Sequence, residues 1–155
     1  PPMIAYILLG ILLVAVTVLI HAIGTSRWLD RLIRRYGRAE AIHRPLDSFR
    51  PLATTAVVLL LLHTLEIMLW ALAYLHLLPS TVLDSLEEAT YFSFVTFTTL
   101  GYGDITLEGP WRILSGIEAL NGILLVGWST AMLFAVVQRS WQDTARNLRD
   151  TQESS

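Results

Sequence analysis

The chain has 155 residues, of which 54% are apolar and only 15% are charged, and its mean hydropathy is +0.54. A soluble domain carries about 25% charged residues, so this chain either buries its surface in a large assembly or lies in lipid. The formal net charge of −2 argues against nucleic-acid binding. Because there is no cysteine, disulfides and thiolate metal sites are excluded.

The first predicted element is a transmembrane helix over residues 1–23. The run Met3–Ile23 carries no charge and, at about 1.5 Å per residue, is long enough to cross the hydrocarbon of a bilayer. No basic residue precedes the run and no small-residue cleavage site follows it, as a signal peptide would require. We therefore expect an uncleaved anchor.

Residues 24–52 form an arginine-rich segment with seven Arg against three acidic residues. Positive loops stay in the cytoplasm, so we expect this segment inside, where an interfacial helix contacts anionic lipid. The side chains expected to dip into the lipid are Trp28, Leu29, Leu32, Ile33 and Tyr36. A voltage sensor is not predicted, because these arginines follow a span and do not recur at every third position within one.

Two more spans are predicted over residues 53–78 and 111–137, and a short helix over residues 85–98 lies between them. Ser85 followed by Glu88 is the pattern of a capping box. This helix is too short to cross alone, and such a segment is tolerated in a membrane where protein or water surrounds it. The fold class is therefore an all-α membrane protein with three transmembrane helices and a re-entrant helix.

The distribution of charged residues predicts how this fold is oriented in the membrane. The interval 79–110 holds five acidic residues and no Arg, so we expect it outside, together with the N-terminus. The C-terminus is then cytoplasmic, with residues 140–155 as a short, partly frayed tail. All 11 basic residues are Arg, which is typical of GC-rich genomes, and we expect a multi-pass protein of a bacterial cell membrane.

The segment Thr98-Thr99-Leu100-Gly101-Tyr102-Gly103-Asp104 resembles the selectivity filter of potassium channels. The resemblance covers residues 53–139 and implies a homotetramer that conducts K⁺ passively, with no enzymatic activity and no cofactor beyond the permeant ion. It places the filter at 99–103, with K⁺ held by the backbone oxygens of Thr99, Leu100, Gly101 and Tyr102. Leu100 stands where valine is commoner. Glycine at 101 and 103 permits the left-handed conformations that turn successive carbonyls one way.

Aligned on this motif, the short helix supplies the filter's support. Tyr91, Phe92 and Phe94 are expected to form an aromatic collar, with the Thr96 hydroxyl near Tyr102; the alternative is that these aromatics face lipid or the core. Asp104 follows the filter and, with its acidic neighbours, is expected to attract cations at the outer mouth. Some family members pair this acid with a Glu from the helix. Val95 takes that place here, so that pair is absent.

The third span resembles a pore-lining inner helix. Gly122 falls at the family's hinge-glycine position, although close helix packing explains it equally well. The residues expected to share one face and line the cavity are Ile123, Val126, Thr130 and Phe134. Phe134, near the inner end, is a candidate constriction.

Two carboxyl groups interrupt the apolar spans, and each has a polar neighbour one turn away. Glu66 follows His63, and Glu118 precedes Asn121. Because a charge in hydrocarbon is costly, we expect two local polar pairs that join helices, or a gate linked to protonation. A metal site is disfavoured, because His-x-x-Glu alone lacks further ligands and the four histidines show no ligand spacing.

Three other functions are compatible with parts of the sequence. A non-selective cation pore would need an altered filter, whereas Gly101-Tyr102-Gly103 is unaltered. A non-conducting subunit of a transport complex would need its filter completed by another protein. A membrane enzyme built on the histidines is disfavoured by their spacing.

Overall fold

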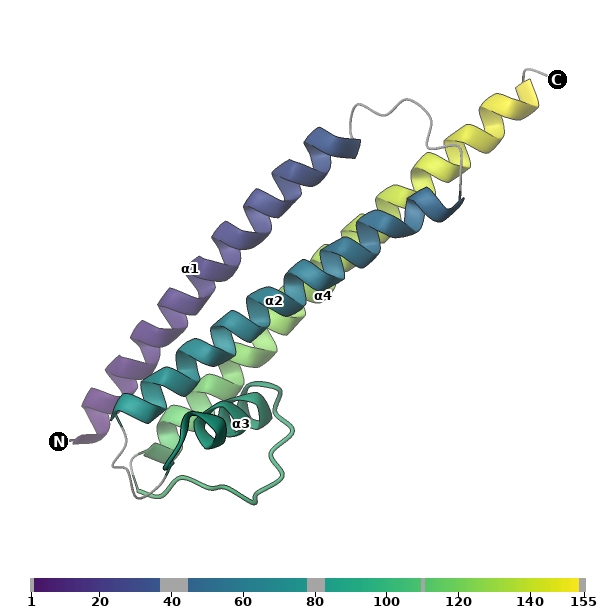
Figure 1. Cartoon of the computed structure of the whole chain (residues 1–155). Helices are drawn as coiled ribbons and strands as arrows, with labels where there is room; N and C mark the ends of the chain where they lie inside the picture. The colour runs from purple at the N-terminus through teal and green to yellow at the C-terminus, as the bar shows by residue number, and fades with distance from the viewer. Residues whose placement is uncertain (1, 37–44, 78–82, 110, 154–155) are drawn as a thin grey trace.

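The structure is a computed structural model that describes residues 2–36, 45–77, 83–109 and 111–153. Within these residues it consists of four helices and no strand. The helices are α1 (Pro2–Tyr36), α2 (Pro45–Leu77), α3 (Leu86–Phe97) and α4 (Trp111–Glu153) (Figure 1). Each of α1, α2 and α4 contains a stretch long and apolar enough to cross a membrane. The predicted all-α fold with three spans and a shorter helix is confirmed.

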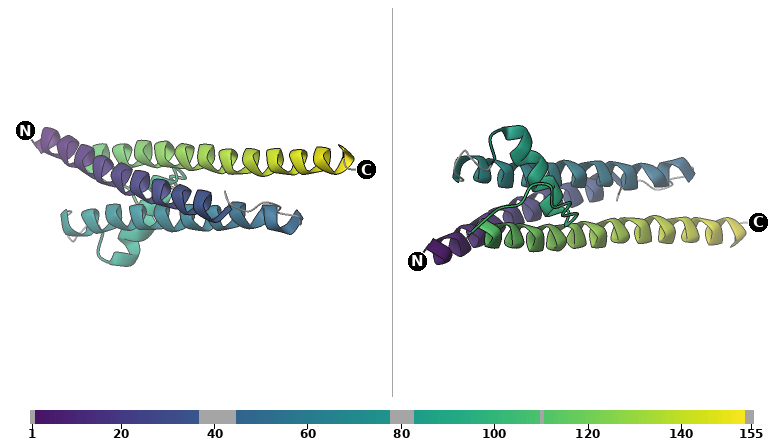
Figure 2. Two further views of the ribbon diagram at one scale, coloured as in Figure 1. Left: turned by 90° about the horizontal axis from the view of Figure 1, so that it is seen from above. Right: turned by 90° about the horizontal axis from the view of Figure 1, so that it is seen from below.

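The three long helices lie alongside one another (Figure 1). α1 and α4 run in one direction and α2 runs in the other, so that the N-terminus lies at the end that carries α3 and the C-terminus lies at the far end. α1 contacts α2 and α4 on one side of that pair, and α3 contacts the same two helices on the other side (Figure 2). The middle pair therefore separates the first helix from the short one.

The first helix is longer than predicted. α1 continues past residue 23 to Tyr36, so residues 24–36 extend the spanning helix and do not form a separate interfacial helix. The apolar run ends where the arginines begin, but the helix continues through them to Tyr36. Gly24 stays helical and lets α2 approach closely: a Cβ atom at this position would lie 2.6 Å from the Leu62 side chain. The Trp28 indole nitrogen donates a hydrogen bond to the Thr55 hydroxyl of α2 at 2.9 Å, a contact between helices that the sequence did not predict.

The other long helices also exceed their predicted bounds. α2 begins at Pro45, eight positions before residue 53, and includes Pro51. α4 continues to Glu153, so the predicted frayed tail is helical over residues 140–153. α4 has neither Gly nor Pro after Gly127, and the polar composition that ends the apolar span does not end the helix.

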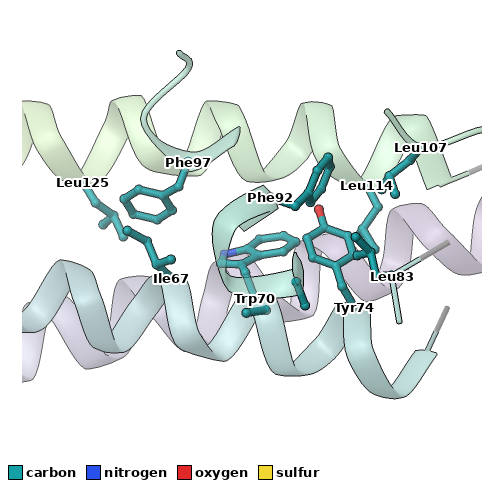
Figure 3. Close-up of a cluster of buried hydrophobic side chains, with 11 residues drawn as sticks. Ile67, Trp70, Tyr74, Leu83, Phe92, Phe97, Leu107, Leu114 and Leu125 are labelled. Carbon is teal, nitrogen blue, oxygen red and sulfur yellow. The ribbon is translucent and has the colours of Figure 1, made fainter. Parts of the chain in front are cut away.

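The buried core fixes α3 against the middle pair of helices. Phe92 of α3 lies beside Tyr74 of α2, and Phe97 lies between Ile67 of α2 and Leu125 of α4 (Figure 3). The Tyr74 and Phe92 rings meet edge to face with their centroids 5.2 Å apart, an arrangement that contributes about 0.5–1.5 kcal/mol beyond the buried area. The short helix is thus positioned by aromatic packing.

Candidate functional site

The start of α3 is fixed by a cap. The Ser85 hydroxyl accepts a hydrogen bond from the Glu88 amide at 3.1 Å, and the Glu88 carboxylate accepts one from the Asp84 amide at 2.9 Å. The acidic first turn suits the positive end of the helix dipole. At the other end, Thr98 caps the helix. The partial negative charge of the helix C-terminus therefore lies beside the motif that follows.

Along that motif, the backbone φ angle alternates between positive and negative values. Thr99, Gly101 and Gly103 have φ values of 59°, 56° and 80°, whereas no positive φ occurs at Leu100 or Tyr102. Positive φ at the two glycines agrees with the prediction. Thr99 was not predicted to share it, and among the described residues it is the only non-glycine with positive φ. A backbone in which positive and negative φ alternate from residue to residue directs successive carbonyl groups toward the same side.

Backbone hydrogen bonds connect residues 99–101 to the last turn of α3. The Val95 carbonyl accepts from the amides of Leu100 and Gly101 at 2.9 and 3.2 Å, and the Thr96 carbonyl accepts from Thr99 at 2.9 Å. Other parts of the chain do not cover this segment, and the Tyr102 side chain is 67% exposed. Within one chain, the segment is a hydrogen-bonded turn followed by an irregular stretch at the surface.

Asp104 has a partner that the sequence did not indicate. The Tyr91 hydroxyl donates a hydrogen bond to its carboxylate at 2.6 Å. This bond, which favours the ionised form, lowers the pKa of the Asp104 carboxyl below its usual value. Helix α3 is therefore joined to the end of the 98–104 motif through a tyrosine, where Val95 offers no carboxylate.

Replacing Tyr91 by Phe tests this contact. The pKa of Asp104 is expected to rise, because the ionised form loses its donor. The contact stabilises the fold at pH values above the usual aspartate pKa, and this contribution disappears as the pH falls through the lowered pKa. Carbon-13 NMR of labelled aspartate measures the shift. Tyr6→Phe is the control, and an unchanged Asp104 titration in the Tyr91 variant would contradict the assignment.

The three predicted collar aromatics do not form one cluster within the chain. Phe92 is buried in the core, whereas Tyr91 and Phe94 are 39% and 40% exposed on α3. One member thus anchors α3 to its own chain, and the other two lie on its open surface.

The predicted cavity face of α4 is open along its length. Ile123 is 59% exposed, Val126 is 43% exposed and Phe134 is 60% exposed, and Thr130 is also exposed. The buried residues of α4 lie on the opposite face at similar spacing, and they include Glu118, Asn121, Leu125 and Ser129. The division of α4 into an open apolar face and a buried face agrees with the predicted pattern.

Gly122 is where α4 meets the end of α3. A Cβ atom at this position would lie 1.8 Å from the Phe97 carbonyl oxygen and 2.7 Å from its carbonyl carbon. Only glycine therefore allows this approach between helix and backbone. The close-packing interpretation of Gly122 has direct structural support.

Comparison with known proteins agrees with this arrangement. The family described as "Ion channel" matches residues 57–139, more than half of the chain. The chain belongs to this ion channel family. It is accordingly a channel and not an enzyme. No curated protein and no solved structure matches the chain.

In this channel protein, four polar residues of the spans form one buried network. His21 Nδ1 lies 2.9 Å from Glu66 Oε1, and His63 Nδ1 lies 3.0 Å from Glu66 Oε2. On their other sides, His63 Nε2 and His21 Nε2 lie 2.9 and 3.3 Å from Ser129 Oγ. The predicted pair of His63 and Glu66 is confirmed, but it is part of a contact among α1, α2 and α4.

The second predicted polar pair is wrong. Asn121 donates to the Thr17 hydroxyl of α1 at 2.8 Å, so it joins two helices and does not contact Glu118. The Glu118 carboxyl is fully buried beside the hydroxyls of Tyr74 and Ser93, although none of these oxygens has a partner that meets hydrogen-bond geometry. Spacing within one helix could not reveal these neighbours, which come from α1, α2 and α3.

Proposed function

We propose that this channel is potassium-selective and conducts dehydrated K⁺ through a filter of backbone carbonyls. The observation that carries the proposal is the alternating sign of φ along the motif, with positive φ at Thr99, Gly101 and Gly103. It lies at the C-terminal end of α3, where the helix dipole favours a cation. The ligands of the ion would be the backbone oxygens of residues 99–102, with the Thr99 hydroxyl at the inner end.

The functional unit in this proposal is a homotetramer. One chain has one filter segment, and replacing the hydration shell of K⁺ takes about eight oxygens. Four identical segments around a closed symmetry axis supply them. The exposed filter, the open surface of α3 and the apolar face of α4 are the surfaces that would meet or line the axis. Tyr91, Phe94 and Thr96 would then contact the filter of a neighbouring chain.

The charges suggest an orientation for this tetramer. Asp104, Glu108 and Glu87 are exposed at the end of the chain that carries α3, and fourfold repetition would make an anionic outer mouth. The exposed arginines of the last α1 turns lie far from that end (Figure 1), where they would meet anionic lipid of the cytoplasmic leaflet. The N-terminus is then outside and the C-terminus inside the cell membrane.

Flux in liposomes tests the proposed selectivity. Wild-type protein is expected to take up rubidium in preference to lithium, to be blocked by barium, and to purify with the mass of four chains. Gly103→Asp is expected to lose this preference while remaining tetrameric, because a side chain at φ 80° strains the filter backbone.

Gly109→Asp is the matched control. Gly109 also has a positive φ, 60°, but lies outside the filter, so the variant adds the same charge and a similar strain. It is expected to keep the preference for rubidium. Equal uptake of rubidium and lithium by a wild-type tetramer would favour a non-selective pore. A wild-type monomer without flux would favour a non-conducting subunit.

Substitution of Phe134 tests whether this residue forms the proposed constriction at the inner end of the pore. It is 60% exposed on the open face of α4, where four rings around an axis would form a hydrophobic gate that excludes water. Phe134→Ala is expected to raise the basal rubidium flux several-fold in liposomes. Trp141→Ala is the control on the same helix, with a side chain that is 73% exposed. If the Phe134 variant shows the basal flux of the wild type, Phe134 is not the constriction.

A further inference from the structure

The buried network contains a set of ligands that the sequence did not indicate. His21 belongs to α1, whereas His63 and Glu66 belong to α2, and one donor atom from each residue lies within 4.8 Å of the others. His21 and Glu66 are fully buried, and the His63 side chain is 14% exposed. Two imidazoles and a carboxylate form a ligand set typical of zinc.

We propose that His21, His63 and Glu66 form a binding site for a divalent transition-metal ion of the Zn²⁺ class. The site is distinct from the filter, and the proposal does not depend on potassium selectivity. It reverses the expectation from the sequence, which disfavoured a metal site because His-x-x-Glu alone lacks further ligands and the four histidines show no ligand spacing.

The distances suit such an ion. Zinc lies about 2.0–2.1 Å from nitrogen and oxygen ligands, so neighbouring ligands of a tetrahedral site lie about 3.3 Å apart. The two contacts between imidazole Nδ1 atoms and the Glu66 oxygens are 2.9 and 3.0 Å. The rings stack with their centroids 5.2 Å apart and their planes 24° from parallel, which leaves both Nδ1 atoms beside the same carboxylate. Small side-chain movements would bring these three residues around one ion, with the second Glu66 oxygen or a water molecule as the fourth ligand.

The number of protons available for these contacts also supports a bound ion. Four contacts link the two imidazoles to Glu66 and Ser129, whereas two neutral imidazoles and one hydroxyl supply three protons. An ion bound by the Nδ1 atoms and Glu66 removes this mismatch. Each imidazole then carries its proton on Nε2, and both donate to Ser129 Oγ, whose oxygen has two lone pairs. A further proton on one imidazole is the alternative that the experiment must separate.

The position of the site links the first helix to the pore domain. The His63 ring lies 5.9 Å from Phe97 at the end of α3, and the His21 ring meets Trp128 of α4 edge to face at 5.5 Å. A bound ion would therefore hold α1, α2 and α4 together beneath the end of the short helix. Aromatic rings on two sides restrict water, which strengthens metal–ligand attraction.

Metal titration of the detergent-purified full chain tests the proposal. The protein is stripped with a chelator and titrated with Co²⁺, whose visible absorption reports four-coordinate nitrogen and oxygen ligands, and then with Zn²⁺ in competition. We expect one ion per chain. His21→Gln and His63→Gln are expected to weaken binding by more than about 100-fold, and Ser129→Ala by about 10–100-fold because Ser129 only orients the imidazoles.

His76→Gln is the matched control, since His76 is exposed on α2 away from the cluster, and it is expected to bind as the wild type does. Equal binding by the wild type and both ligand variants, or far less than one ion per wild-type chain, would overturn the proposal and favour the extra proton. X-ray absorption of Zn²⁺-loaded wild type gives a second test that needs no variant. Two imidazoles in the first shell are expected, and an oxygen-only shell would also overturn the proposal.

Discussion

Gly122→Ala is expected to displace the end of α3 from α4 and to lower the thermal stability of the channel. The added Cβ would lie 1.8 Å from the Phe97 carbonyl oxygen, and the obstacle is backbone, which cannot rotate away. Overpacking of this kind costs about 1–3 kcal/mol. Because Phe97 lies two positions before the proposed filter at 99–103, we also expect reduced rubidium flux. Thermal unfolding in detergent and liposome flux measure the two effects.

Gly116 and Gly127 are matched controls on the same helix, because a Cβ atom at either position has no neighbour within 4 Å in the chain. Alanine at these positions is expected to leave stability unchanged or slightly improved, since it favours helix over glycine. If Gly122→Ala alters channel opening but unfolds at the same temperature as wild type, Gly122 acts as a hinge, and the packing explanation is wrong.

Glu66→Ala is expected to cause the largest loss of stability among substitutions in the spans. Its two carboxylate oxygens each contact an imidazole, and all of this carboxyl is buried. Removing this carboxyl leaves two imidazole nitrogens without a hydrogen-bond partner, and each such buried group costs about 1–3 kcal/mol because it does not regain water. The contact between α1 and α2 should weaken most. Denaturant unfolding, with limited proteolysis of α1 as a local probe, measures the effect.

Thr64→Ala is the control for Glu66→Ala. Thr64 is exposed two positions away, and its hydroxyl donates only to the Leu60 carbonyl of its own helix. A change within about 0.5 kcal/mol is expected, as for most surface substitutions. Similar unfolding of both variants would mean that the network contributes little to stability.

The first helix lies wholly outside the family match, which covers residues 57–139. It nevertheless contacts α2 and α4 closely at particular positions. At Gly10 a Cβ atom would lie 2.7 Å from the Ile117 side chain of α4, and Thr17 and His21 contribute buried hydrogen bonds to α4 and α2. Close glycine contacts with buried polar bonds are the usual means of helix association in membranes. We therefore expect α1 to remain attached to α2 and α4.

The sequence by itself determined the elements of this protein. Uninterrupted apolar runs require helices in a bilayer, because only a helix satisfies its own backbone there. Ser85 with Glu88 fixed the start of α3, and Gly101 with Gly103 predicted positive φ, since these features depend on neighbours along the chain. Helix ends were less well predicted: hydropathy reports where an apolar run ends, whereas α1 and α4 continue as polar helices.

Only the tertiary structure decided which distant residues meet. His21 joins Glu66 across 45 positions and Asn121 joins Thr17 across 104, and the approach of Gly122 to Phe97 depends on how α3 lies against α4. Such contacts depend on the rotation and crossing of whole helices. Those are set by the packing of many side chains together, and no spacing within one segment contains them.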